Sequence, residues 1–227
     1  MTSPAVYSPV TIQCQAILFD MDGILVSSLG TVERTWTRWA ERRGLDPANT
    51  VSLAHGRRAI EVIAALRPDL DGEAELRRIE DLEIADDEGL QVLPGVLDLL
   101  RELPGDRWTV VTSATERLAR ARLATGGIPL PGRLVTADHV TRGKPHPEPF
   151  LAGAEFLGFA PQQCVVFEDS SSGAKAGREA GCTVIATTFS HPVEALYAAH
   201  YLVTDLTGVA ARATSQGIML KLTPLGN

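Results

Sequence analysis

The sequence has 227 residues, a formal net charge of −7, 44% hydrophobic residues and 22% charged residues. This is the composition of an ordinary globular protein, and its acidic balance argues against a nucleic-acid or anionic-membrane surface, which would need a basic patch. No apolar run approaches the length of a membrane span, and the N-terminus lacks the basic-then-apolar pattern of a signal peptide. We therefore expect a cytoplasmic protein with no nucleic-acid or membrane partner.

Three cysteines, Cys14, Cys164 and Cys182, are an odd number without metal-type spacing. Two of them adjoin apolar, strand-like runs, so buried free thiols in a reducing compartment are expected.

The first third of the chain predicts one strand followed by helices. Residues 1–13 carry prolines and small polar residues without periodicity, and are expected to be a loosely held leader. Residues 16–19 are apolar without helical spacing and predict a short buried strand. Helical patterns then cover residues 28–43 and 57–66, and a third runs through the acidic residues 71–88. Residues 27–90 thus contain three helical patterns and no convincing strand, which predicts a helical insert.

Two features of this insert can be interpreted further. Trp36 and Trp39 share the inner face of the first helix and should be core residues. The acidic run is most simply explained as a solvated helix face, with metal binding as the weaker alternative.

From residue 91 onwards, strands alternate with helices. The expected strands are 108–111, 133–135, 164–167 and 183–186, and the expected helices are 96–103, 115–124, 147–157 and one starting near 173. This alternation predicts βαβ units and a parallel sheet. The fold class is therefore α/β, with a Rossmann-like core formed by residues 1–26 and 91–227 and a helical cap formed by residues 27–90. Residues from about Thr204 give weaker signals and are not assigned.

Polar residues follow three of the predicted strands. They are Asp20 and Asp22 in the turn Asp20-Met21-Asp22-Gly23, Thr112 and Ser113, and Glu168 and Asp169, while Lys144 lies in a loop between the second and third group. An Asp-x-Asp-Gly sequence by itself is most often a plain turn. The carboxyl ends of parallel strands, however, meet at one edge of a sheet, so these residues should converge on one crevice.

Their chemistry fits phosphoryl transfer. Two carboxylates about 4 Å apart repel by roughly 4 kcal/mol at an effective dielectric of 20, so the group needs a cation, and carboxylate oxygens suit Mg²⁺. One Asp can then act as a nucleophile, and a second carboxylate two residues on can move protons. Ser113 or Thr112 can donate a hydrogen bond to the phosphoryl group, and Lys144 can neutralise its charge.

These residues carry a family resemblance. The segments 20–23, 111–113, 143–147 and 166–169 resemble, in order and spacing, the motifs of haloacid-dehalogenase (HAD) superfamily phosphatases with a helical cap. The resemblance covers about residues 16–189. Segments 55–58 and 143–149 further resemble small sugar-phosphate and glycerol-phosphate phosphatases.

The resemblance implies a role for each matching residue. Asp20 would be the nucleophile and a Mg²⁺ ligand, and Asp22 the general acid/base that gives its backbone carbonyl to the metal. Asp169 would be a further metal ligand, with Glu168 close by. Ser113, with Thr112 as the fallback, and Lys144 would bind the phosphoryl group. The implied activity is Mg²⁺-dependent hydrolysis of a small sugar or polyol phosphate through an aspartyl-phosphate, by a monomer or weak dimer.

Three positions depart from family patterns. The family often has Thr and Asp where this chain has Ile24 and Ser27, which leaves the hinge into the cap open. Related phosphomutases carry a histidine where this chain has Val32, which disfavours a mutase, and the presence of Asp22 disfavours a dehalogenase. A non-catalytic binding protein on the same fold is the other alternative, although the nucleophile and metal positions are intact.

The insert is expected to select the substrate. His55, Arg57 and Arg58 are predicted at a helix start, where they either contact sugar hydroxyls and phosphate or are solvated. Glu33 and Arg34 could face either way. His146, next but one to Lys144, is expected to order its loop.

Overall fold

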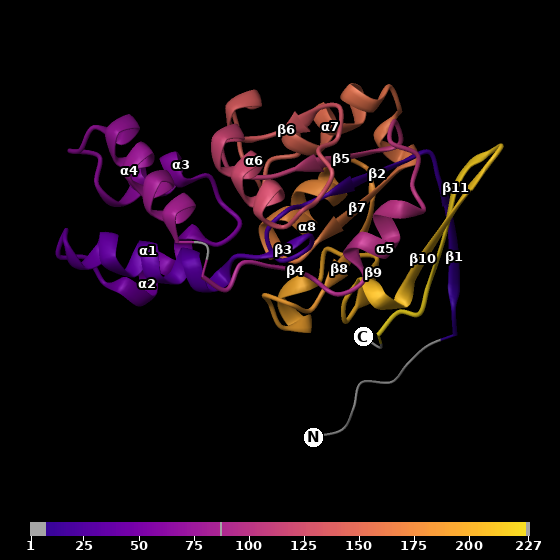
Figure 1. The fold of residues 1–227 in the computed structure, drawn as a ribbon, viewed down its shortest axis with the longest axis horizontal. Coiled ribbons are helices and arrows are strands. Elements are labelled where there is room, and N and C mark those ends of the chain that lie inside the picture. The colour runs from indigo at the N-terminus through magenta and orange to yellow at the C-terminus, as the bar shows by residue number, and fades with distance from the viewer. Residues whose placement is uncertain (1–7, 87, 226–227) are drawn as a thin grey trace, which may run out of the picture.

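A parallel six-stranded sheet forms the centre of the computed structural model, which describes residues 8–86 and 88–225 (Figure 1). Its strand order is β6-β5-β2-β7-β8-β9, and every neighbouring pair is parallel. The strands are β2 (Ala16–Phe19), β5 (Trp108–Val111), β6 (Leu134–Val135), β7 (Cys164–Glu168), β8 (Thr183–Thr187) and β9 (Tyr201–Val203). The predicted α/β class with a parallel sheet is confirmed.

The central strand β2 is buried on both faces, as its unbroken apolar run requires. Ile17 and Phe19 face a core shared with α5 (Val96–Arg101) and α6 (Glu116–Thr125). Ala16 and Leu18 face the opposite core, shared with α7 (Glu148–Leu157) and α8 (Ser171–Glu179). Side chains of a strand alternate between its two sides, so four consecutive apolar residues serve both cores. Burying a large apolar side chain is worth about 1.5–3 kcal/mol, so this run fixes the sheet centre.

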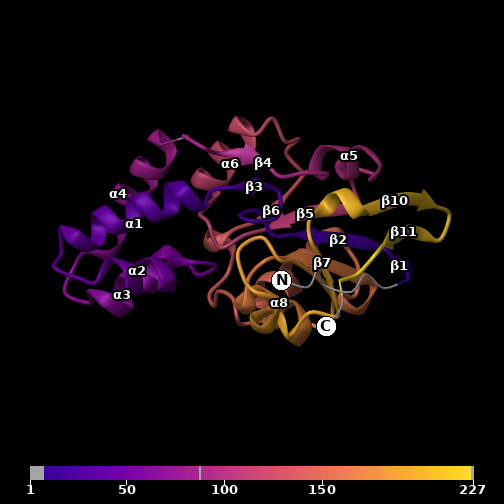
Figure 2. The same cartoon turned by 90° about the horizontal axis from the view of Figure 1, so that it is seen from below.

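Four helices extend from one end of the sheet and form a separate helical segment (Figures 1 and 2). They are α1 (Leu29–Glu41), α2 (Pro47–Ala54), α3 (Ala59–Leu66) and α4 (Gly72–Ala85). Trp36 and Trp39 are buried in a hydrophobic cluster of this segment, as predicted. The helix α2 was missed, although Asp46 caps it and Pro47 begins it, which is a typical helix-start signal.

The segment joins the sheet through two short antiparallel strands, β3 (Val26–Ser27) and β4 (Gln91–Val92). These strands lie at its two ends, so the insert leaves and re-enters the core at one place. Short 3-10 helices complete the described chain: η1 (Ala137–His139), η2 (Pro161–Gln163), η3 (Val193–Leu196) and η4 (Leu206–Gly208).

The expected loose leader is wrong for its last residues. β1 (Val10–Cys14) pairs with β11 (Gly217–Leu222), which also pairs with β10 (Val209–Thr214), in an antiparallel sheet. This sheet packs on the core of α5 through residues such as Leu220 and Leu222. The partners of β1 lie more than 200 residues away, as in the pairing of Val10 with Leu222, so local sequence gave no sign of the pairing. Residues 1–7 of the predicted leader lie outside the described residues.

The interpretation of the acidic run as a solvated face holds for its exposed members, Asp71, Glu73, Asp81 and Glu88, but is wrong for three glutamates. Glu75, Glu80 and Glu83 of α4 are buried, with at most 7% of each residue exposed. Each meets a polar partner from another element: Arg43 after α1 contacts Glu75, Thr115 contacts Glu80, and Arg122 contacts Glu83. Buried charge is tolerated where it is paired, and these partners could not be inferred from the charge pattern.

The three cysteines are free and buried, as expected. Among the helices of the described residues, none has both the length and the apolar character needed to cross a membrane.

Candidate active site

The site residues follow three adjacent strands. β2 lies between β5 and β7, so Asp20 is flanked by Thr112 on one side and by Glu168 and Asp169 on the other. The strand pairing continues to the site, because Asp20 N donates to Phe167 O at 2.9 Å and Thr112 N to Val135 O at 2.9 Å. The backbone of the sheet therefore sets the positions of these side chains.

Three buried carboxylates form the centre of the site. Asp20, Glu168 and Asp169 each place an oxygen within 4.8 Å of the others. Lys144 Nζ donates to Asp20 Oδ1 at 2.6 Å, to Glu168 Oε1 at 2.6 Å and to Val111 O at 3.0 Å. The structure thus brings together four residues that the sequence predicted to converge, and sets one positive charge against three negative charges.

Burial and the excess of negative charge shift the pKa values of the residues in this cluster. Burial raises the pKa of Asp20, which the cation of Lys144 opposes and the negative charge of Glu168 reinforces. Burial also raises the pKa of Asp169 well above its usual range, again with a contribution from Glu168. Burial alone would lower the pKa of Lys144, but its two carboxylate partners outweigh this effect and raise it. A further cation at the cluster would therefore be bound favourably.

Glu168 directs both of its oxygens at protein donors. Oε1 accepts from Lys144, and Oε2 accepts at 2.9 Å from Asp169 N, Ser170 N and Ser170 Oγ. A Cβ at Gly173 in α8 would overlap this carboxylate, so only glycine leaves it room. The carboxylates of Asp20 and Asp169 keep oxygens for another ligand, and such a pair fits a hard divalent cation.

Asp169 has a neighbour that sequence reasoning missed. Ser190, which follows β8, donates to its Oδ2. Gly23 passes close beside this pair with φ +82°, and a Cβ there would overlap Asp169. The turn after β2 therefore needs glycine for both its conformation and its contact with Asp169.

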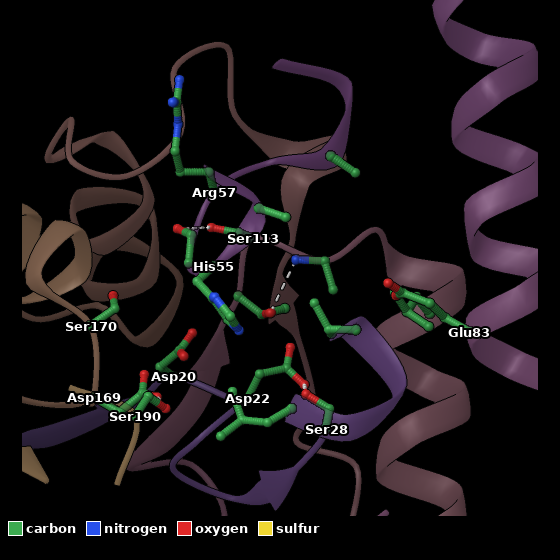
Figure 3. A pocket seen from close by; sticks show the side chains of 18 of the residues that line it. Asp20, Asp22, Ser28, His55, Arg57, Glu83, Ser113, Asp169, Ser170 and Ser190 are labelled. Atoms are coloured by element: carbon green, nitrogen blue, oxygen red, sulfur yellow. Dashed lines mark hydrogen bonds between the residues drawn. The ribbon is translucent and has the colours of Figure 1, made fainter. Parts of the chain in front are cut away.

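The carboxyl group of Asp22 points away from this cluster. Its Oδ1 accepts from Ser28 Oγ at 2.7 Å (Figure 3). Arg122 Nη1 donates to both of its oxygens at 2.9 Å. Arg122 Nη2 also donates to Glu83 Oε2 at 2.9 Å. Burial raises the pKa of Glu83 to about 7, although the charge of Arg122 acts in the opposite direction. No sequence signal distinguished Arg122 or Glu83 from the other charges of their helices.

A cavity of about 100 Å³ connects Asp20 and Asp22 with the helical segment. Thr112 and Ser113 line it: Thr112 Oγ1 accepts from Ala114 N at 3.1 Å, and Ser113 Oγ donates to Gly56 O at 3.2 Å. The Ser113 hydroxyl thus contacts the turn between α2 and α3. This contact joins the core side of the cavity to the helical side.

The three predicted cap residues lie in two different places. His55 and Arg57 line the cavity, in the turn between α2 and α3 rather than inside a helix start (Figure 3). Arg58, the residue preceding α3, instead donates to Thr141 O at 2.7 Å and pairs with Glu61. Arg58 therefore contacts the loop before Lys144 and is not among the residues lining this cavity.

A second histidine, His191, also lines the cavity and was not predicted. Burial lowers the pKa of His55, and the neighbouring His191 contributes to this shift. Ser190 and His191 lie in the loop after β8, at the same edge of the sheet as the other site residues, with Thr188 and Phe189 between them and the strand.

The remaining candidates lie away from the cavity. Glu33 is exposed, and Arg34 pairs with Asp86 at 2.7 Å at the end of α4. His146 Nδ1 accepts from Glu148 N at 3.1 Å, consistent with the expected loop-ordering role.

Comparison with known proteins agrees with this geometry. The family model of haloacid dehalogenase-like hydrolases matches residues 14–181. Hexitol phosphatase A of Escherichia coli (strain K12) is 45% identical over 179 residues, which cover 77% of this chain and 83% of that protein. Glycerol-1-phosphate phosphohydrolase 2 of Saccharomyces cerevisiae is 33% identical over 195 residues, which cover 80% and 78%. A crystal structure of a hydrolase from Pseudomonas syringae has a TM-score of 0.75 over 85% of this chain and 94% of that one, at 22% identity, which bears on the fold alone.

The chain belongs to the haloacid dehalogenase-like hydrolase family. The resemblance inferred from its motifs is confirmed, and the named relatives agree with the prediction of a phosphatase.

Proposed function

We propose that this protein hydrolyses a small sugar or polyol phosphate monoester through a phosphorylated Asp20, with Mg²⁺ as its metal. The observation that carries the proposal is the buried cluster of Asp20, Asp169 and Glu168 with Lys144 in contact. The sugar and polyol class is supported by the names of two relatives, a hexitol phosphatase and a glycerol-1-phosphate phosphohydrolase.

The carboxylates of Asp20 and Asp169, with the backbone carbonyl of Asp22, would hold Mg²⁺. When bound, the ion would neutralise charge on the carboxylates and on the phosphate. Glu168 was also predicted as a metal ligand; its hydrogen bonds favour a different role, holding Lys144 and Ser170 in place.

In the first step, a carboxylate oxygen of Asp20 attacks phosphorus and the bond to the ester oxygen breaks. Asp22 gives its proton to that departing oxygen, which leaves as the alcohol. In the second step, the Asp22 carboxylate takes a proton from water, whose oxygen attacks phosphorus. The bond to Asp20 then breaks, inorganic phosphate leaves, and both carboxyl groups return to their starting states.

Other side chains would bind the phosphoryl group and select the substrate, and one of them bears on the choice between a hydrolase and a phosphomutase. Lys144 and the hydroxyl of Ser113 or Thr112 would bind its oxygens. His55 and Arg57 would select the rest of the substrate, and Arg58 would act only by ordering the loop before Lys144. Val32 lines the cavity without a polar atom, which favours a hydrolase over a phosphomutase.

Two further aspects belong to this proposal. Residues 27–90 would act as a cap on a core formed by residues 1–26 and 91–227, supported by the separate hydrophobic cluster around Trp36. The protein would work as a monomer or weak dimer in the cytoplasm, where its buried thiols remain reduced.

The test is phosphate release from a panel of sugar and polyol phosphates with Mg²⁺. We expect turnover of at least one substrate by the wild type and none by Asp20→Asn, which should keep the wild-type circular dichroism spectrum. Absence of phosphate release from the whole panel would refute the proposal, and substantial turnover by Asp20→Asn would refute the assignment of the nucleophile.

A further inference from the structure

We propose that Arg122 is a positioning residue that fixes the carboxyl group of Asp22 and ties its orientation to the docked position of α4. The inference rests on the proposed function, because it concerns the proton transfers assigned to Asp22. It assigns a role in the reaction to an arginine and a glutamate that lie outside the motifs of the resemblance.

The contacts use both terminal nitrogens of the Arg122 guanidinium group. Arg122 Nη1 donates to both oxygens of Asp22 at 2.9 Å, and Nη2 donates to Glu83 Oε2 at 2.9 Å. Asp22 follows β2, Arg122 lies on α6 and Glu83 lies on α4, so one side chain joins three elements. A lysine, with a single nitrogen, could not reproduce this bridge.

The bridge is closed off from solvent on the side of the helical segment. All three residues line the cavity, but the side chains of Arg122 and Glu83 are 6% and 4% exposed, whereas that of Asp22 is 30% exposed. Asp22 is thus the most accessible of the three side chains. Ser28 fixes Asp22 Oδ1 from a second direction, so the carboxyl group is oriented by two elements.

Packing of α6 against α4 does not require an arginine that also contacts Asp22. On the same helix, Arg117 pairs with Asp81 at 2.6 Å and with Glu80 at 3.4 Å, both on α4, and its side chain is 53% exposed. Arg117 therefore joins α6 to α4 without touching Asp22. Arg122 differs from it in the additional contact with the acid/base, and this makes Arg117 a matched control.

Coupling to α4 gives the bridge a consequence for turnover. With α4 docked, Glu83 holds one terminal nitrogen of Arg122, which leaves the other aimed at Asp22. If α4 moves away, Arg122 loses this partner and Asp22 loses a fixed donor. Proton transfer to the departing oxygen should then be efficient only when the helical segment covers the cavity.

The test compares two leaving groups in single-turnover reactions with Mg²⁺. A polyol phosphate needs a proton from Asp22 when its alkoxide departs, whereas 4-nitrophenyl phosphate releases a stable phenolate without one. We expect Arg122→Gln to lower phosphorylation by the polyol phosphate about 100-fold, the low end of general-acid effects, and by the aryl phosphate less than about 10-fold. Asp22→Asn should show the same selectivity for leaving group, and Arg117→Gln should change both rates by less than about threefold.

Two more variants separate the parts of the bridge. Glu83→Gln keeps the contact between Arg122 and Asp22 but weakens the tie to α4, so it should lower the polyol phosphate rate by less than Arg122→Gln does. Arg122→Lys keeps the charge and should recover only part of the rate, and these two variants carry the test if Arg122→Gln does not fold.

The outcomes distinguish the two proposals. Equal losses for both leaving groups in Arg122→Gln, or a profile like that of Arg117→Gln, would overturn the positioning role while the phosphatase stands. Full recovery by Arg122→Lys would also overturn it, because two terminal nitrogens would then be unnecessary. A wild type that releases phosphate from neither ester would instead refute the proposed function.

Discussion

Replacement of Gly173 by alanine gives a sharp test of the site geometry, because general helix propensity predicts the opposite result. Gly173 lies inside α8, where glycine costs up to about 1 kcal/mol relative to alanine. A Cβ at this position would, however, overlap the buried carboxylate of Glu168. Neither side can yield easily, since the carboxylate is fully buried and the glycine is part of a helix packed on the sheet.

The expected magnitude follows from the contacts of Glu168. Its displacement would stretch the 2.6 Å bond from Lys144 or the three 2.9 Å bonds from Asp169 N and Ser170. Breaking a buried ion pair costs about 3–5 kcal/mol, and the helix gains up to about 1 kcal/mol in return. The net loss of about 2–4 kcal/mol corresponds to a decrease in Tm of roughly 10 °C for a chain of this size. Phosphate release should also fall, because the same lysine contacts Asp20.

Thermal unfolding monitored by circular dichroism measures the stability, and phosphate release measures the site. Gly30→Ala in α1 is the matched control, because an added Cβ there meets only the flexible end of Arg34. This control should keep or raise the Tm by a few degrees and leave activity unchanged. A Gly173→Ala variant as stable and active as the wild type would show that Glu168 does not occupy the described position.

Two further predictions concern the metal and Glu83. Mg²⁺ at 100 times its Kd should stabilise the wild type by about 2.7 kcal/mol, which corresponds to a rise in Tm of roughly 5–10 °C. Chelation of the metal should reverse this rise, and the substitution Asp169→Asn should abolish it. A shift that persists in Asp169→Asn would place the metal elsewhere. Because the pKa of Glu83 is raised from 4.5 to about 7, the folded protein retains a proton that the unfolded chain has lost between these values. Wild-type stability relative to Glu83→Gln should therefore fall as pH rises from 4.5 to 7, by at most about 3 kcal/mol, and then level off in urea titrations; a flat difference would contradict the burial of this charge.

The convergence of the predicted site residues could be inferred from the sequence because it depends on strand direction rather than on side-chain packing. Asp20, Thr112 and Glu168 each follow an apolar run, and the parallel order of those runs brings them to one edge of the sheet. Lys144 was assigned to the same crevice although it lies in a loop, and the structure places its Nζ between two carboxylates. The sequence pattern could not predict which carboxylate has oxygens left for a metal and which one holds Lys144, because this depends on the hydrogen bonds that each oxygen accepts.

Residues whose role depends on contacts across the chain were not recognised. Arg122 is 100 positions from Asp22 and 39 from Glu83, and nothing in its helix marks it as the buried member of several arginines. Ser190 and His191 were missed for a different reason. They follow a predicted strand, but Thr188 and Phe189 separate them from its end, so they are not the polar residues directly after it.

The burial of Glu75, Glu80 and Glu83 shows that part of the acidic run contacts other elements of the protein, which the net charge of the run did not indicate. A solvated acidic face would repel the carboxylates of the site, yet α4 directs these three side chains at donors on other elements. The raised pKa of Glu83 indicates that burial makes ionisation of this residue unfavourable, and that the charge of Arg122 offsets only part of this effect. A contact that fixes one orientation is what an acid/base at the edge of a substrate cavity requires. The charge of α4 thus connects the helical segment to the carboxyl group that is proposed to move the proton.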